Sequence, residues 1–270
     1  MKHFYRALRF LFIFLVLTAF TQIGGLVYLA YKPLGKYVSN RLSGRLKYLR
    51  VFVFVAFYLL VSLIVVPPLA KQFGRVPLPK NNPKLTPATH LTWICNRHYV
   101  KPTLLSLLDD VANSLPEGMS VVYLDANFPF IDGFPLIGHL SHDDGEKVDL
   151  AFIYSNNQGA YLNDGKTFTG FGHVEGPKKG EINQPQLCAE QGYWQYSFAS
   201  NWSWVEQAKD YEFDAQANQL LLRKLAKDPR TGKIFIEPHL TKRLKLQRFS
   251  KVRFHGCHAA RHDDHIHLQL

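Results

Sequence analysis

The sequence predicts an α+β fold: a small antiparallel sheet with flanking helices carries the functional residues, and two transmembrane helices precede it. Two observations lead to this prediction. Strand-like and helix-like segments alternate irregularly from about residue 89 to residue 270, which is typical of the α+β class. Two long uncharged runs precede that region, and a chain of 270 residues has room for one ordinary domain besides them.

The positive charge of the chain is confined to its first part. The formal net charge is +11, but residues 1–108 hold 15 of the 32 Lys and Arg residues and no Asp or Glu. The remaining 17 basic residues face all 21 acidic residues, so residues 109–270 have a net charge of −4. The predicted domain therefore has no overall positive field, and we expect no nucleic-acid partner.

Two uncharged runs predict membrane spans at about 10–31 and 51–70. They contain 22 and 20 residues, and at about 1.5 Å per residue each is about long enough to cross a hydrocarbon core of roughly 30 Å. A cleaved signal peptide is the alternative for the first run, but the run is too long for one and no small-x-small cleavage site follows it.

Basic residues predict the orientation of these spans. Six of them lie between the spans, at Lys32, Lys36, Arg41, Arg45, Lys47 and Arg50. The positive-inside rule places this loop in the cytoplasm and both chain termini outside. We therefore expect a membrane anchor at 1–71, a proline-rich extended tether at 72–88 and a domain at 89–270 on the periplasmic side of the cytoplasmic membrane.

The first elements of the domain are predicted to be a helix at 102–115 and a strand at 120–124. Apolar residues recur near helical spacing in the first segment, and Pro102 suits a first helical turn. The second is a β-branched and aromatic run, as is typical of strands. A further strand is expected at 148–154, followed by a long loop over 155–192, where Gly, Asn, Lys and Pro dominate.

The C-terminal part is predicted to contain further helices at 202–207, 214–227 and 240–248. A strand is expected at 232–237, and the last strand is the C-terminal run that carries His265 and His267. Three cysteines, Cys95, Cys188 and Cys257, allow one disulfide and one free thiol in an oxidising compartment. The sequence does not choose among the three pairings.

Histidine and aspartate residues predict a metal site. His265 and His267 are two apart in a strand-like run, so their side chains share a face. Six residues including Gly145 separate His142 from Asp149, and a turn followed by a strand would let both converge. With one C-terminal histidine they make a three-ligand zinc set that leaves a fourth position for water, as in catalytic zinc sites.

This pattern resembles a known superfamily. Ser141-His142-x-x-Gly145-x-x-x-Asp149, with a His-x-His near the C-terminus, resembles the zinc peptidases that include lysostaphin, D-Ala-D-Ala peptidases and the hedgehog fold. The finer match is to penicillin-insensitive murein endopeptidases, which have further histidines three before the first ligand and three before His-x-His, here His139 and His262. The resemblance covers about residues 90–270.

The resemblance implies roles for individual residues. His142, Asp149 and His267 would bind zinc. His265 would be a general base or transition-state stabiliser, and His262 would assist catalysis. The implied activity is hydrolysis of peptide cross-links in peptidoglycan at a D-amino-acid amide bond. The alternatives are a D,D-carboxypeptidase or dipeptidase on the same site, and a zinc-stabilised binding module without turnover.

Some residues have two interpretations or depart from the pattern. His139 either orients a ligand or touches substrate, and Arg97 either binds a substrate carboxylate or is an ordinary surface arginine. Lys147 would place a cation beside the metal. The chain ends three residues after His267, so we expect the last strand to have little support from neighbouring strands.

Overall fold

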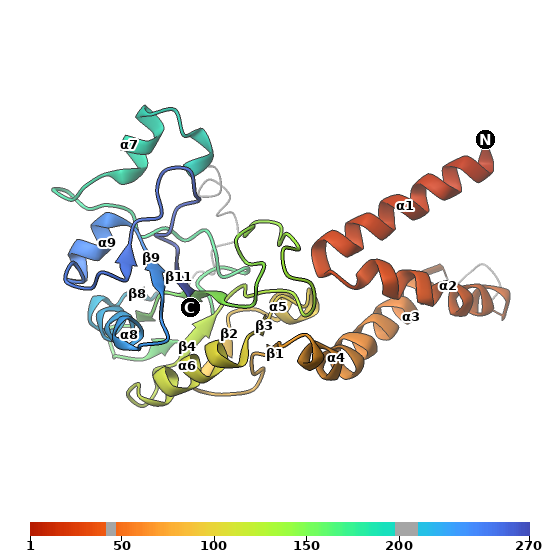
Figure 1. Cartoon of the computed structure of the whole chain (residues 1–270), viewed down its shortest axis with the longest axis horizontal. Helices are drawn as coiled ribbons and strands as arrows, with labels where there is room; N and C mark the ends of the chain where they lie inside the picture. The colour runs from red at the N-terminus through yellow and green to blue at the C-terminus, as the bar shows by residue number, and fades with distance from the viewer. Residues whose placement is uncertain (42–46, 198–209) are drawn as a thin grey trace.

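The computed structural model describes residues 1–41, 47–197 and 210–270 (Figure 1). Its domain is built on a six-stranded sheet in the order β10-β9-β11-β5-β4-β2. These strands are Val252–Arg253 (β10), Lys233–Phe235 (β9), His265–Gln269 (β11), Lys147–Ala151 (β5), Val121–Tyr123 (β4) and Leu85–Pro87 (β2). The four central strands are antiparallel, whereas β2 is parallel to β4 and β10 is parallel to β9. The α+β class is confirmed, but the sheet is mixed rather than antiparallel.

The two faces of the sheet carry different kinds of residue, because successive side chains along a strand point to opposite faces. Val148, Leu150, Ile266 and Leu268 are fully buried in the main core. There they join leucines of the amphipathic helices α6 (Pro102–Asn113) and α8 (Ala215–Lys227). The residues between them, Asp149, His265 and His267, consequently point to the opposite face. The hydrophobic core thus fixes which side of the sheet carries the polar residues.

Shorter elements complete the domain. A three-stranded sheet in the order β7-β6-β8 and a two-stranded pair of β1 and β3 lie beside the main sheet. The strands are Tyr161–Leu162 (β7), Tyr154–Ser155 (β6), Glu212–Phe213 (β8), Val76–Pro77 (β1) and Tyr99–Val100 (β3). The remaining helices are α5 (His90–Ile94), α7 (Gln184–Glu190), a 3-10 turn (Trp194–Ser197) and α9 (Pro238–Arg243).

Most predicted elements of the domain exist, with different ends. The helices expected at 102–115 and 214–227 and the strands expected at 120–124 and 232–237 are confirmed within a few residues. The strand expected at 148–154 is divided into β5 and β6, and the loop expected at 155–192 contains β7 and α7. The helix expected at 240–248 instead begins at Pro238 and ends at Arg243. The helix expected at 202–207 lies outside the described residues.

The segment 72–88 is not an extended tether. Val76 and Pro77 pair with β3, Leu78 is fully buried, and β2 forms an edge of the main sheet. The guanidinium of Arg75 is buried and donates to the carbonyls of Phe128 and Asp143. Apolar residues between the prolines explain the difference, because they give the segment side chains to bury.

The first uncharged run does not form one helix across 10–31. Helix α1 (Lys2–Thr21) ends before Gln22, which has a φ of 63°, and α2 (Gly24–Arg41) returns alongside α1. The hydroxyl of Thr21 accepts a bond from the Gly24 nitrogen. A Cβ on Gly25 would lie 2.7 Å from the carbonyl oxygen of Phe14, so only glycine allows this close approach.

The second run forms a nearly continuous helix. It consists of α3 (Lys47–Leu60), a π-helical turn (Val61–Val65) and α4 (Val66–Gln72). Within residues 1–41, 47–197 and 210–270, two helical segments are long and apolar enough to cross a membrane, His3–Thr21 and Tyr48–Gln72. The second candidate agrees with the prediction of 51–70, whereas the first is shorter and closer to the N-terminus than predicted.

Helices α1, α2 and α3 change direction twice. Helix α1 leads from the N-terminus towards the domain, α2 leads away from it, and α3 returns (Figure 1). The N-terminus thus lies at the end of α1 that is far from the domain. The prediction that both chain termini lie outside stays a prediction.

A disulfide joins Cys188 in α7 to Cys257, and Cys95 is a free cysteine. The cross-link closes a loop with a sequence separation of 69 residues. We expect Cys257→Ser to lower the free energy of unfolding by about 4 kcal/mol, because the unfolded chain gains the freedom that the cross-link removes. Chemical denaturation with and without reductant measures this. Cys95→Ser is the matched control, and an equal loss in that variant would contradict the expectation.

Candidate metal centre

Pairing between β5 and β11 brings the central residues together. His267 is directly opposite Asp149, and His265 is opposite Ala151, two positions further along the same face. Opposed side chains on neighbouring antiparallel strands have Cβ atoms about 5 Å apart, so the carboxylate and the His267 ring meet. The small side chain of Ala151 leaves room for the His265 ring.

His142 reaches the same point from the loop before β5. Gly145 turns this loop with a φ of 82°, and its nitrogen donates to Asn127 Oδ1 at 3.1 Å. The Asn127 amide in turn donates to the Lys147 carbonyl at 2.7 Å. Asn127 is fully buried and thereby fixes the loop to the start of β5.

Three donor atoms form a small triangle. His142 Nε2 lies 3.2 Å from Asp149 Oδ1 and 3.1 Å from His267 Nδ1, and His267 Nδ1 lies 2.9 Å from Asp149 Oδ1. Tetrahedral zinc with ligands at 2.0–2.1 Å separates its donor atoms by about 3.3 Å. The triangle is therefore close to the size that such an ion requires.

The tautomer of His142 supports a cation at this point. Its Nδ1 lies 2.8 Å from the carbonyl oxygen of Ala126, which can only accept, so Nδ1 carries the hydrogen. In the neutral ring Nε2 then presents a lone pair towards Asp149 Oδ1, which is another acceptor. Two lone pairs facing each other in a buried site need a positive ion or a proton between them.

His139 approaches the other oxygen of the same carboxylate. Its Nδ1 lies 2.7 Å from Asp149 Oδ2, and the group formed by His139, His142 and Asp149 is able to hold a metal ion. Asp149 thus lies between two possible third donors, with His139 on one oxygen and His267 on the other. Its side chain is 0% exposed. Burial alone would raise the pKa of Asp149, but the imidazoles of His142, His265 and His139 hold this pKa well below its ordinary value.

His265 stands beside the triangle and is held by Asp264. Its Nδ1 is 2.5 Å from Asp264 Oδ1, and its Nε2 is 3.7 Å from Asp149 Oδ1. Burial would lower the pKa of His265, but Asp264 and Asp149 raise it to about 9. A divalent cation beside it would act in the opposite direction. The carboxylate of Asp264 thus orients the imidazole of His265.

The imidazole of His262 packs against the rings of the other C-terminal histidines. Its ring centroid lies 4.9 Å from that of His265 and 5.7 Å from that of His267. Burial, together with these two neighbours, holds the pKa of His262 well below its ordinary value. A neutral imidazole in this place packs against the catalytic candidates rather than against the carboxylate.

Glu237 is a buried residue of this region that the sequence analysis missed. Its Oε1 accepts the backbone N–H of His262 at 3.1 Å and the hydroxyl of Tyr196 at 2.5 Å. Burial raises the pKa of Glu237 to about 7. A lone glutamate at the end of a predicted strand has no local signal, because its role comes from a residue 25 positions away.

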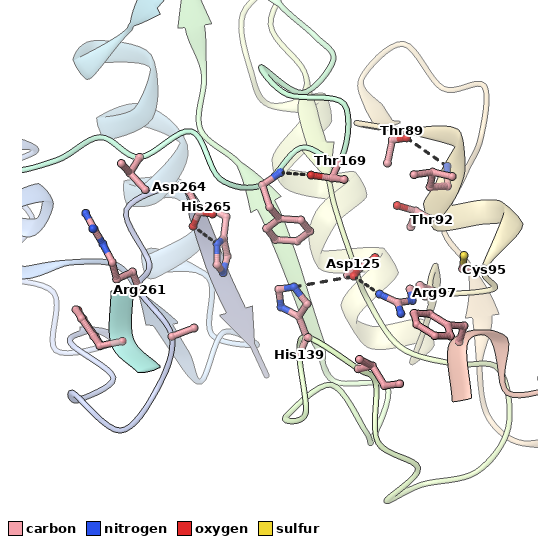
Figure 2. A pocket seen from close by; sticks show the side chains of 18 residues that line it. Thr89, Thr92, Cys95, Arg97, Asp125, His139, Thr169, Arg261, Asp264 and His265 are labelled. Atoms are coloured by element: carbon pink, nitrogen blue, oxygen red, sulfur yellow. Dashed lines mark hydrogen bonds and ion pairs between the residues drawn. The ribbon is translucent and has the colours of Figure 1, made fainter. Parts of the chain in front are cut away.

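A cavity of about 500 Å³ opens beside His139 and His265. In Figure 2, His139 and Asp125 lie between two groups of residues: Arg261, Asp264 and His265 on one side, and Thr89, Thr92, Cys95 and Arg97 on the other. Arg97 donates to Asp125 at 2.9 Å, and Asp125 Oδ2 lies 4.0 Å from His139 Nε2. Arg97 is therefore a cavity residue rather than an ordinary surface arginine.

Lys147 and the C-terminal strand are the two places where the sequence was expected to depart from the family pattern. Lys147 forms ion pairs with Asp143 and Asp144. The last strand does not lack support, since β11 is paired with β5 on one side and β9 on the other. The prediction failed because the position of a strand in the sheet is independent of its closeness to the chain terminus.

Comparison with known proteins does not assign the chain to a family. No family model matches it, and no curated protein is significantly similar to it. The resemblance of the histidine pattern to zinc peptidases therefore remains a hypothesis.

The two possible third donors can be separated by substitution. We expect His267→Ala to weaken zinc binding more than His139→Ala, since His267 Nδ1 belongs to the triangle with His142. The loss of an orienting residue costs about 10- to 100-fold in affinity, and the loss of a ligand costs more. Competition titration against a chromogenic chelator measures both variants. A larger loss in His139→Ala would show that the ion binds on the Oδ2 side of Asp149.

Proposed function

We propose that the chain is a membrane-anchored zinc peptidase that hydrolyses peptide cross-links of peptidoglycan at a D-amino-acid amide bond. The observation that carries the proposal is the triangle of His142, Asp149 and His267 donor atoms, 2.9–3.2 Å apart, beside which His139 and His265 line a cavity. A structural zinc site has four protein ligands, whereas three ligands with access to a cavity are typical of hydrolases. The choice of peptidoglycan rests on the resemblance of the histidine pattern.

In this proposal the chain's own residues position the reactants and move protons. When bound, zinc supplies Lewis-acid chemistry that activates water and polarises a carbonyl. His265 takes a proton from the attacking water and returns one to the leaving amine, while Asp264 on Nδ1 keeps Nε2 directed towards the reaction. Arg97 lies across the cavity from His265, where its guanidinium is able to orient a substrate carboxylate.

Two further observations support a location at the outer side of a membrane. Disulfides such as Cys188–Cys257 persist in oxidising compartments, which favours a domain outside the cytoplasm. Six Lys and Arg residues lie between the two uncharged runs. The positive-inside rule favours a cytoplasmic position for this loop, and the second span then leads to a domain on the other side of the membrane.

The proposal predicts metal-dependent release of cross-linked peptides. Purified sacculi incubated with the full chain in detergent should yield monomeric muropeptides by mass analysis. Chelator should abolish the product, zinc should restore it, and penicillin should not inhibit because there is no serine nucleophile. Free D-Ala as the main product would instead identify a carboxypeptidase.

The role of His265 is tested by removing its ring. His265→Ala should lower kcat by at least about 100-fold, the typical contribution of a positioned acid–base group, and leave one zinc per chain. Turnover and metal content are measured on the same sample, with His3→Ala, which removes an exposed histidine, as the control. Loss of zinc from His265→Ala would make it a fourth ligand and favour a binding module without catalysis.

A further inference from the structure

The second membrane span runs alongside the domain for much of its length. The hydroxyl of Tyr58 donates to the Ile94 carbonyl at 2.6 Å, and Asn96 donates to the Tyr58 and Ser62 oxygens at 2.8 and 3.3 Å. Tyr58 is only seven residues, or about 10 Å, from Val51, where the uncharged run begins. The remaining run to Ala70, about 18 Å long, therefore lies at the level of the domain.

The side of this helix that does not face the domain is apolar and exposed. Its exposed residues are Leu60, Leu63, Ile64, Val65 and Leu69, and Ile64 is 65% exposed. A membrane-spanning helix buries such residues in lipid. Because the domain packs on the other side of the same turns, the adjoining face of the domain must lie at the same depth.

That face of the domain also exposes large apolar side chains. We call it the apolar rim and define it by Phe73, Leu91, Ile94, Ile131 and Ile137. Ile131 is 57% exposed and Ile137 is 45% exposed. The rim is continuous with the membrane helices, since the Phe130 nitrogen donates to Gln22 at 2.9 Å and the Phe73 and Phe130 rings are 5.1 Å apart.

The cavity beside the metal centre opens within this region. Phe20, in the last turn of α1, lines the cavity together with Leu91 and Ile137 of the apolar rim and with His139 and His265. A molecule in the cavity would therefore contact a membrane-spanning helix and the candidate catalytic histidines at once. A fully water-soluble substrate would not need a cavity whose wall includes a membrane-spanning helix.

We propose that the apolar rim is seated in the bilayer and that the cavity receives a peptide carried on a membrane lipid. The lipid chain stays in the bilayer beside Phe20 and the rim, while the peptide extends to His265 and the metal donors. The substrate assignment rests on the proposed function and narrows it to cross-linked peptides that are still attached to a lipid. The seating of the rim is independent of any catalytic activity.

Seating is tested with fluorescent labels on the full chain in phosphatidylethanolamine and phosphatidylglycerol vesicles. Ile131→Cys, Ile137→Cys and Ile64→Cys, in a Cys95→Ser background, are labelled with bimane and mixed with brominated lipids. The control is Ile182→Cys, since Ile182 is also an exposed isoleucine, at 49%, but lies outside the rim. We expect quenching at 131 and 137 comparable with that at 64, and none at 182. No quenching at 131 and 137 would overturn the seating.

The substrate is tested with one D-amino-acid-containing peptide, either free or attached to a lipid. The unlabelled wild-type chain should hydrolyse the lipid-linked form at least about tenfold faster when both are in the same vesicle, because they share a surface. The same lipopeptide in separate vesicles should not be cut. Ile131→Ser should reduce cleavage of the lipid-linked form alone, and Ile182→Ser should change neither.

The possible failures are distinguishable. Equal hydrolysis of the free and lipid-linked peptides, in shared and separate vesicles, would overturn the lipid-linked substrate and leave the peptidase intact. Absence of hydrolysis in every form would overturn the substrate assignment together with the proposed function. In both cases the quenching data decide the seating by themselves.

Discussion

The buried carboxylate of Asp149 is the constraint on which the site depends. A carboxylate taken out of water loses several kcal/mol of solvation, which must be replaced by positive or hydrogen-bonding partners. Here nitrogens of four imidazoles lie between 2.7 and 3.7 Å from its oxygens. Two of these rings come from β11 and two from the loop before β5. Because the Asp149 carboxylate interacts with rings from both segments, it links the register of β5 and β11 to the conformation of the loop before β5.

That register is itself determined by the opposite face of the sheet. A shift of one residue between β5 and β11 would place Asp149 in the hydrophobic core instead of Val148 and Leu150. Burying its carboxylate there would destabilise the fold. The pairing that buries Ile266 and Leu268 therefore also places His267 opposite Asp149. The hydrophobic effect stabilises this strand pairing. Because side chains alternate between the two faces of the sheet, the same pairing fixes the positions of the candidate metal donors on the other face.

The sequence was sufficient for the parts of the fold and site that depend on local patterns. The His-x-His spacing, the Gly145 turn and the leucines of α6 and α8 each carry their own signal, so their predicted positions were close to those in the structure. The predictions failed where packing between segments remote in sequence determines the structure. The pairing of segment 72–88, the central position of β11 and the role of Glu237 depend on partners remote in sequence, which one sequence without its fold does not show.

The turn between α1 and α2 shows how one misread feature alters the function inferred from it. Thr21, Gln22 and the Gly24-Gly25 pair lie inside the span predicted over 10–31, but polar side chains and glycines together also favour a chain reversal. In the structure they end α1 beside the domain, so that Phe20 becomes part of the cavity wall. A straight helix over 10–31 would have carried Phe20 past the domain and left the cavity bounded by the domain alone. The break in the helix is therefore what joins the apolar N-terminal helices to the candidate site, and under the proposed function this junction would restrict which substrates reach His265.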